Sequence, residues 1–192
     1  MSLSFQETSE FLTRHRDLIM EKLVSFLKKI GIPCLKVHEE YIPKNTFCKN
    51  VLIKNGSVLY SKKAKVSDML HEAGHIAIFP KEIRPLASGY LNTAYRKLGS
   101  LISDMGFDDE RKLQAYMGCD DDGATAWAWC VGTMLGYKDS SIIKNEDYGG
   151  DGLDVMFSLK TTYYSGNKRL YYLGLLDNTK NFPNLDRFLN PY

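Results

Sequence analysis

The first part of the chain carries apolar residues at the spacing of a helix. Over residues 10–30 they return every three or four positions, which places them on one helix face. Gly31 ends this pattern, and Pro33 prevents it from resuming. The sequence therefore predicts an amphipathic helix that packs on a core, with His15 as a packed side chain on its apolar face. The apolar positions are Phe11, Leu12, Leu18, Ile19, Leu23, Phe26, Leu27 and Ile30.

A β-hairpin is predicted for residues 51–60. Apolar and β-branched residues flank the pair Asn55-Gly56 in this segment. Asn-Gly supplies the two positive φ angles of the type I′ turn that joins antiparallel strands. A basic stretch, residues 62–65, then leads into the next predicted helix.

That next helix is expected to end before Pro80. We expect Ser67 or Asp68 to cap its amino end. Most of its positions are uncharged, so the helix can be buried on several sides. Gly74 costs about 1 kcal/mol of helix propensity relative to alanine, which a need for close backbone packing would explain.

The same helix contains His71-Glu72-Ala73-Gly74-His75, a complete HExxH motif. Histidines four positions apart lie on one helix face, so both imidazoles can reach a single metal ion. The glutamate between them lies beside that ion, where it can take a proton from a water molecule. The motif predicts a metal-dependent hydrolase with Glu72 as its catalytic base.

The rest of the chain is predicted as three helices followed by a second hairpin. Apolar periodicity indicates the helices, and Gly136 closes the last of them. In the final third, apolar and aromatic runs flank a turn-forming segment, which is typical of strands. No internal repeat or linker divides the chain, so one domain of residues 1–192 is expected. The helices are expected over residues 95–102, 108–116 and 120–135, and the strands over residues 155–159 and 170–173.

Composition and charge disfavour several classes of protein. A chain of 192 residues with 44% hydrophobic and 25% charged residues is ordinary for one soluble globular domain. The net charge of +2 provides no basic field for a nucleic acid, so no nucleic-acid partner is expected. No apolar run approaches the roughly 20 residues of a membrane span, so no membrane partner is expected.

The amino end lacks the features of a secretory signal. The four cysteines, Cys34, Cys48, Cys119 and Cys130, show no CxxC spacing. Free thiols are therefore expected, with a structural zinc–cysteine site as the alternative. Because free thiols persist in a reducing compartment, we expect a cytoplasmic protein.

A catalytic zinc site usually takes three protein ligands and leaves one position for water, so two histidines are not sufficient. No histidine follows His75. The third ligand is therefore expected to be a carboxylate, with the upstream His15 and His38 as alternatives. Cys119 and Cys130 are further alternatives, although thiolate ligands are more typical of structural sites.

Three aspartates begin the helix predicted over residues 120–135. One or two of them can be explained as caps that complement the helix dipole. Trp127 lies below Asp120 and Trp129 below Asp122, where they would hold a neighbouring helix away. We therefore assign the third ligand to Asp121, with Asp122 as the next candidate. The face below Asp121 carries only small residues, namely Ala124, Thr125, Ala128 and Gly132.

These residues resemble the pattern of the zincin metallopeptidases, and among them the ImmA/IrrE-like group of bacterial and mobile-element proteins. That group carries a hairpin, an HExxH helix and a later helix of the type acidic-x-x-Ala-x-x-aromatic-Ala. The resemblance covers residues 50–136, and the aspartate stands where that group usually has glutamate. Residues 147–152 are similar to those of an uncharacterised bacterial group that shares the HEAGH helix. The later helix is matched by Asp121, Ala124, Trp127 and Ala128.

The resemblance implies an α+β, zincin-like fold. Its parts would be the N-terminal helix, a small sheet with the hairpin, the HExxH helix packed on a second, ligand-bearing helix, and a C-terminal β-hairpin. It also implies a zinc metallopeptidase that cleaves a peptide or protein substrate. In that enzyme Zn²⁺ would be bound by His71, His75 and Asp121.

In this hypothesis Glu72 activates a zinc-bound water, and a tyrosine stabilises the developing oxyanion. Tyr148, Tyr163 and Tyr164 are the candidates for that tyrosine. Two alternatives are kept. One is a regulatory or protein-binding module whose metal site is structural or vestigial, and the other is a hydrolase of a non-peptide amide.

Overall fold

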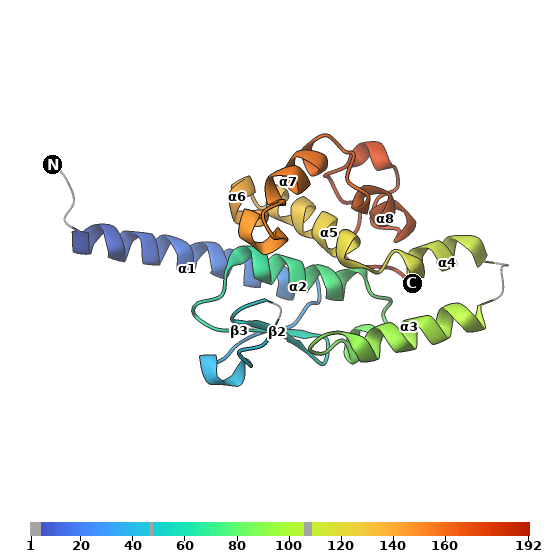
Figure 1. The fold of residues 1–192 in the computed structure, drawn as a ribbon, viewed down its shortest axis with the longest axis horizontal. Coiled ribbons are helices and arrows are strands. Elements are labelled where there is room, and N and C mark those ends of the chain that lie inside the picture. Colours follow the sequence, from blue (N-terminus) through green and yellow to red (C-terminus); the bar gives the residue numbers. More distant parts are fainter. Residues whose placement is uncertain (1–4, 47, 106–108) are drawn as a thin grey trace.

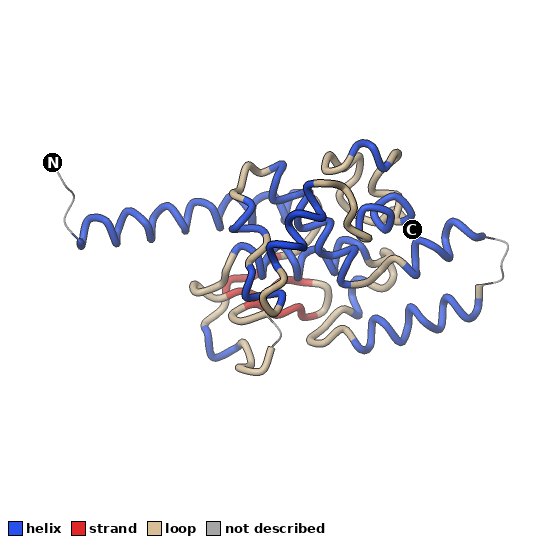
Figure 2. The backbone as a smooth tube through the Cα atoms, turned by 45° about the horizontal axis from the view of Figure 1, so that its top comes forward, coloured by secondary structure: helices blue, strands red, loops and turns tan. Residues whose placement is uncertain are grey.

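The computed structural model describes residues 5–46, 48–105 and 109–192, with side chains from residue 14 onward. This part of the chain contains eight α-helices and one three-stranded sheet, which confirms the expected α+β class. Figure 1 shows the HExxH helix, α2 (Val66–Ile78), between the sheet and a layer of helices that includes α5 (Asp121–Met134). Figure 2 shows the strands confined to one small sheet. No helix in the described ranges is long and apolar enough to cross a membrane.

The first helix, α1 (Phe5–Lys29), confirms the predicted helix, and Gly31 follows it with a left-handed φ of 93°. Its carboxyl-terminal half packs on the core through Leu23 and Leu27. The other half extends away from the remaining elements (Figures 1 and 2). His15 is exposed there, so the prediction that it packs in the core is wrong. Sequence spacing shows which residues share a face, but not whether another element covers that face.

The predicted hairpin is confirmed as β2 (Val51–Lys54) and β3 (Ser57–Tyr60), which pair antiparallel. Asn55 and Gly56 have φ angles of 50° and 70°, the positive values that a type I′ turn requires. A short strand, β1 (Cys34–Lys36), pairs parallel to β3 and completes the sheet in the order β1-β3-β2. Helix α2 packs on β2 and β3, so the sheet supports the HExxH motif from one side.

Helix α2 is buried on nearly all sides, as its uncharged residues predicted. Lys65 occupies the capping position, and the prediction that Ser67 or Asp68 caps the helix is wrong. The helix begins earlier than expected, so both residues lie inside its first turn. There the Ser67 hydroxyl donates to Asp68 at 3.4 Å and to Asp147 at 3.2 Å. The helix ends shortly before Pro80, as expected.

Helix α5 packs directly on α2. A β-carbon built at Gly74 would lie 2.5 Å from the carbonyl oxygen of Ala124, so the two backbones touch at this point. Only a residue without a side chain permits such an approach. This contact confirms the expectation that Gly74 serves close backbone packing. Asp120 caps α5 by accepting a hydrogen bond from the Gly123 N–H at 3.0 Å.

The predicted C-terminal β-hairpin is wrong. The segment forms two helices, α7 (Gly152–Lys160) and α8 (Gly166–Tyr172). Leu170 and Leu173 are both buried and three positions apart, the spacing of one helix face. The residues expected to form the turn begin α8, which packs on α5. Short apolar runs fit either a strand or a helix, and here the packing against α5 decides between them.

The remaining elements connect these layers. The two helices predicted over residues 95–102 and 108–116 are present with shifted bounds, and residue 108 lies outside the described residues. A short helix follows α5, and single turns of 3₁₀-helix occur at several connections. The helices are α3 (Asn92–Asp104), α4 (Glu110–Met117) and α6 (Asp139–Ile142), and the 3₁₀ turns are Glu39–Tyr41, Arg84–Leu86, Asn145–Tyr148 and Thr179–Asn181.

We expect Gly74→Ala to lower the free energy of unfolding by about 1–3 kcal/mol, because the added methyl group overlaps the Ala124 carbonyl and forces the helices apart. Gly99→Ala is the matched control. Gly99 lies in α3, where an added β-carbon would meet no atom within 4 Å, so this change should stabilise the protein by about 0.5–1 kcal/mol. Urea unfolding followed by circular dichroism measures both. Equal effects of the two substitutions would contradict the inferred backbone contact.

Candidate metal centre

Helices α2 and α5 bring together the three residues that the sequence assigned to a metal ion. His71 and His75 lie one turn apart on α2, and Asp121 is the first residue of α5. The Nε2 atom of His75 lies 3.2 Å from Nε2 of His71 and 3.1 Å from Oδ1 of Asp121. Oδ1 of Asp121 lies 3.8 Å from Nε2 of His71. Among the described residues, this is the one group of three ligand side chains close enough to hold an ion.

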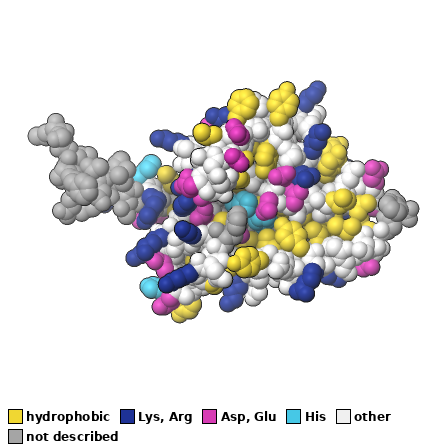
Figure 3. Space-filling model, viewed as in Figure 1, with side chains coloured by type: hydrophobic (Ala, Val, Ile, Leu, Met, Phe, Trp, Pro, Cys, Tyr) yellow, Lys and Arg dark blue, Asp and Glu magenta, His cyan; other side chains and the backbone are white. Residues whose placement is uncertain are grey.

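The spacing of these three atoms suits a tetrahedral zinc ion. Ligands about 2.0–2.1 Å from zinc at tetrahedral corners lie about 3.3–3.4 Å apart, and the three distances fall on both sides of this value. The imidazoles are largely buried, whereas the Asp121 side chain is 84% exposed. Figure 3 shows a histidine side chain at the surface near the centre of one face, beside acidic side chains. The group is therefore open on one side, where a catalytic zinc site keeps its fourth position.

The charge states of His71 and Asp121 also favour a cation. Burial and the neighbouring His75 lower the pKa of His71 to about 3, so its imidazole is neutral at neutral pH. A hydrogen bond from His75 lowers the pKa of Asp121 and keeps this carboxylate ionised. Nδ1 of His75 is buried and meets no hydrogen-bond partner in the described part of the chain, so this ring lacks the support that ligand histidines often have. Two histidine nitrogens with a carboxylate are a donor set typical of Zn²⁺.

The two aspartates next to Asp121 have other partners. Oδ2 of Asp120 lies 2.6 Å from Nε of Arg169. Asp122 accepts a hydrogen bond from the hydroxyl of Tyr164 at 3.1 Å. Neither aspartate belongs to the group of ligand side chains. The structure thus brings the histidines together with Asp121 and not with the alternative ligand, Asp122.

The other alternative ligands also lie outside this group. His15 and His38 are exposed. Cys119 donates a hydrogen bond to the carbonyl of Ile78 at 3.1 Å, and Cys130 is buried in the core. All four cysteines are free thiols, as expected.

Glu72 lies beside the metal group. It is 8% exposed and lines the same cavity as His75 and Asp121. Burial raises the pKa of its carboxyl, towards the range in which a general base is most effective at neutral pH. The thiol of Cys48 is near enough to act on this carboxyl, and it partly offsets the rise in the pKa. The sequence did not indicate that contact, because no local pattern connects Cys48 with the HExxH helix.

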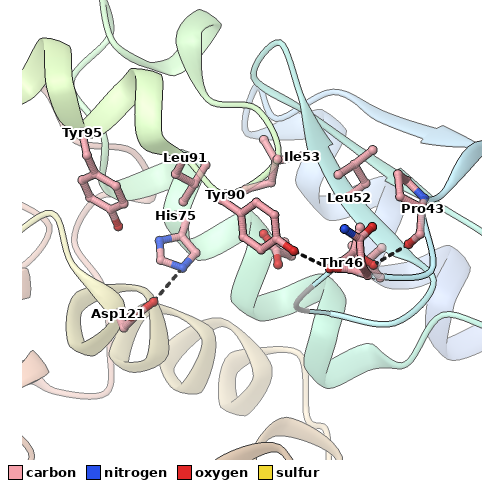
Figure 4. A pocket seen from close by; sticks show the side chains of 13 residues that line it. Pro43, Thr46, Leu52, Ile53, His75, Tyr90, Leu91, Tyr95 and Asp121 are labelled. Atoms are coloured by element: carbon pink, nitrogen blue, oxygen red, sulfur yellow. Dashed lines mark hydrogen bonds and ion pairs between the residues drawn. The ribbon is translucent and has the colours of Figure 1, made fainter.

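A largely apolar cavity of about 450 Å³ opens on one side of the metal group, and we call it the apolar cavity. Glu72, His75 and Asp121 form its polar end. Figure 4 shows the Tyr95 hydroxyl pointing towards the space in front of His75 and Asp121. The rest of its wall includes Pro43, Leu52, Ile53, Tyr90 and Leu91.

A second cavity, of about 420 Å³, lies on the other side of the metal group, and we call it the acidic cavity. His71 and Asp121 belong to its wall. Because Asp121 lines both cavities, the metal group stands between them. The acidic residues in this wall are Asp68, Asp121, Asp122, Asp147 and Asp151.

Two of the three candidate tyrosines lie in the wall of the acidic cavity. These are Tyr148, whose hydroxyl lies 3.2 Å from that of Thr125, and Tyr164. Tyr163 is 87% exposed and lines neither cavity. The structure therefore brings Tyr148 and Tyr164, but not Tyr163, to the cleft beside the metal group.

Tyr95 lines the apolar cavity, although no pattern in the sequence points to it. Its ring packs edge-on against Phe79, with 5.4 Å between the ring centres. Burial, and to a smaller extent Asp121, raise the pKa of its hydroxyl, so Tyr95 stays a hydrogen-bond donor. Helical spacing alone could not identify this residue, because its role depends on where α3 packs.

No protein-family model matches this chain, and comparisons with curated proteins and with solved structures found no match either. The resemblance to the zincins therefore stays a prediction that rests on the HExxH motif and the later helix.

Asp68 is a buried carboxylate in the wall of the acidic cavity, with 6% of its surface exposed. Burial and the nearby Asp147 raise its pKa from 3.8 to about 6. In the unfolded chain this carboxyl ionises near its ordinary pKa, but in the folded protein it ionises only at higher pH. The folded state therefore loses stability relative to the unfolded state as the pH rises through this interval.

We expect Asp68→Asn to raise the free energy of unfolding on the order of 1–3 kcal/mol at about pH 7.5, and to change it little at about pH 4. The reason is that asparagine removes the buried charge but keeps the shape of the side chain. Chemical unfolding of chelator-treated protein at both pH values measures the difference. Asp154→Asn, at an exposed position of α7 outside both cavities, is the control. A destabilised Asp68→Asn protein at the higher pH would contradict the inferred cost of the charge.

Proposed function

We propose that this protein is a zinc-dependent hydrolase that cleaves peptide or protein substrates. The observation that carries the proposal is the group of His71, His75 and Asp121, whose spacing is compatible with a zinc ion and which is open on one side. Structural zinc sites are usually closed by four protein ligands, whereas catalytic sites have three. A buried carboxyl, Glu72, lies beside the open group and supports the catalytic alternative.

Zn²⁺ bound by these residues would polarise a scissile carbonyl and make a nearby water molecule more acidic. Glu72 accepts a proton from the attacking water and then donates it to the leaving amine. Its raised pKa suits both steps, because the carboxyl takes up and releases a proton closer to neutral pH. Tyr95, which lines the apolar cavity, and Tyr148, which lines the acidic cavity, are the candidates to donate a hydrogen bond to the carbonyl oxygen.

The two cavities favour an extended substrate over a small amide. An extended peptide advances about 3.3 Å per residue, so residues on both sides of the cleaved bond can reach a cavity each. Each cavity falls within the size range of small-ligand pockets. The aliphatic part of the apolar cavity, with Leu52 and Leu91, suits an apolar side chain of the substrate. A small amide would occupy only one of the two spaces.

Glu72→Gln should abolish hydrolysis while zinc content and fold stay unchanged, because the amide keeps the shape of the carboxyl but cannot accept the proton. We expect turnover to fall about 10²–10⁴-fold, the usual contribution of a general base. A quenched fluorogenic peptide library measures turnover, elemental analysis measures zinc, and circular dichroism measures the fold. The matched control is Glu21→Gln, at an exposed position of α1. A Glu72→Gln protein as active as the wild type would favour a regulatory module with a structural metal site.

Metal binding needs its own test, because a hydrogen bond between two imidazoles has the same length as the observed distance of 3.2 Å. We expect one zinc ion per chain, and a loss of affinity of about 100-fold or more in Asp121→Ala, since one of three ligands is removed. Competition with a chromophoric chelator measures the affinity. Asp154→Ala is the matched control. Equal affinities of the two variants would exclude Asp121 as a ligand, and a wild-type protein without zinc affinity would remove the proposal.

A further inference from the structure

The acidic cavity has an excess of negative charge. Its wall contains five aspartates, and no lysine or arginine is found among the described residues that line it. Three of these aspartates have partners outside the cavity or in the metal group. Asp121 contacts the two histidines, Asp122 lies 3.8 Å from Nη2 of Arg169, and Asp147 lies 3.2 Å from Nζ of Lys65.

Of the other two aspartates, Asp151 is exposed to solvent, whereas Asp68 is buried and its charge has no such compensation. Its carboxylate accepts one long hydrogen bond, from the Ser67 hydroxyl at 3.4 Å, and forms no ion pair within the described part of the chain. Lys65 and Lys144 act on it from farther away, and their effect is smaller than those of burial and Asp147. A carboxylate that is 6% exposed and lines a cavity therefore lacks a cationic partner.

The position of Asp68 in the first turn of α2 does not explain its burial. An acidic residue there complements the helix dipole, but an exposed carboxylate also does so, without the free-energy cost of burial. Burying a carboxylate without a cation costs free energy, and buried charges in proteins are normally paired. A cation that enters the cavity from outside would provide the missing partner for Asp68, and it would lie close to Asp147 and to the exposed Asp151 as well.

We propose that the acidic cavity is a specificity pocket that binds a lysine or arginine side chain of the substrate, next to the bond that is cleaved. This inference rests on the proposed function, because it takes the cleft at His71 and Asp121 as the place of cleavage. The cavity is large enough for such a side chain, since about 420 Å³ falls in the range of small-ligand pockets. The apolar cavity offers no comparable partner, because the acidic residues in its wall are Glu72 and Asp121 of the catalytic group itself. The two sides of the cleft would therefore select different side chains.

A set of short quenched fluorogenic peptides tests the pocket. A single lysine is placed at each position in turn, and norleucine, which has a similar length but no charge, replaces it in the matched peptides. All peptides are acetylated at the amino end, so that only the side chain supplies a cation. We expect kcat/KM of the zinc-loaded protein to be at least about tenfold higher for lysine than for norleucine at one position. This preference should decrease as the salt concentration rises.

Substitutions in the wall of the acidic cavity then test whether this cavity causes the preference for lysine. Asp68→Asn should reduce the lysine-to-norleucine ratio at least about fivefold, whereas Asp154→Asn should leave that ratio unchanged. Asp151→Asn, at an exposed position of the same wall, should reduce the ratio to a smaller extent. This variant replaces Asp68→Asn in the test if Asp68→Asn does not fold. A wild-type protein without preference for lysine at any position would overturn the proposal. If Asp68→Asn folds and its lysine-to-norleucine ratio is unchanged, the proposal is also overturned. If Asp68→Asn does not fold, an unchanged ratio in Asp151→Asn overturns the proposal.

Binding separates this inference from the proposed function. The zinc-loaded Glu72→Gln protein is titrated with versions of the same peptides that carry the fluorophore without the quencher, and fluorescence anisotropy reports the dissociation constants. If no peptide is cleaved by the wild type but lysine peptides still bind more tightly, and Asp68→Asn removes the difference, the pocket is supported and the hydrolase is not. If peptides are cleaved but neither cleavage nor binding distinguishes lysine from norleucine, the hydrolase is supported and the pocket is not.

Discussion

The backbone contact between Gly74 of α2 and Ala124 of α5 is the constraint on which the site depends. With no side chain at Gly74, the two helices approach until a carbonyl oxygen occupies the place of a β-carbon. This approach brings Asp121, one turn before Ala124, to 3.1 Å from His75. A larger residue at position 74 would displace the start of α5 and with it the third candidate ligand. Packing between helices and the geometry of the metal group are therefore parts of one arrangement.

Burial shifts the pKa of three titratable groups around this contact. Burial raises the pKa of Glu72 and Asp68 and lowers that of His71, so each is shifted towards its neutral form. Asp121 is the exception, because it accepts a hydrogen bond from His75 and reaches solvent. Several perturbed groups in one cleft are more typical of a functional site than of a core, although structural networks also perturb pKa values. The cost of these buried groups is offset by the apolar packing of α2 against the sheet and α5.

Several sequence predictions that depend on neighbouring residues are confirmed, whereas two that depend on contacts between distant elements are wrong. The hairpin was predicted because Asn55-Gly56 determines its turn locally. The contact between α2 and α5 was predicted because small residues on a helix face permit one kind of packing. The strands expected at the end of the chain are helices α7 and α8, since a short apolar run such as the one at Leu170 fits either structure until a neighbour selects one. The exposed position of His15 was missed for the same reason.

The sequence by itself determined the spacing of His71 and His75, the place of Glu72 between them and the small-residue face that pointed to Asp121. These features depend on residues a few positions apart, where helix geometry alone relates one side chain to the next. Only the tertiary structure placed Tyr95 and Cys48 beside the metal group and brought Asp147 to Ser67 and Asp68. Such neighbours are tens of residues apart in the chain, and the packing of separate elements, which no local spacing encodes, brings them together.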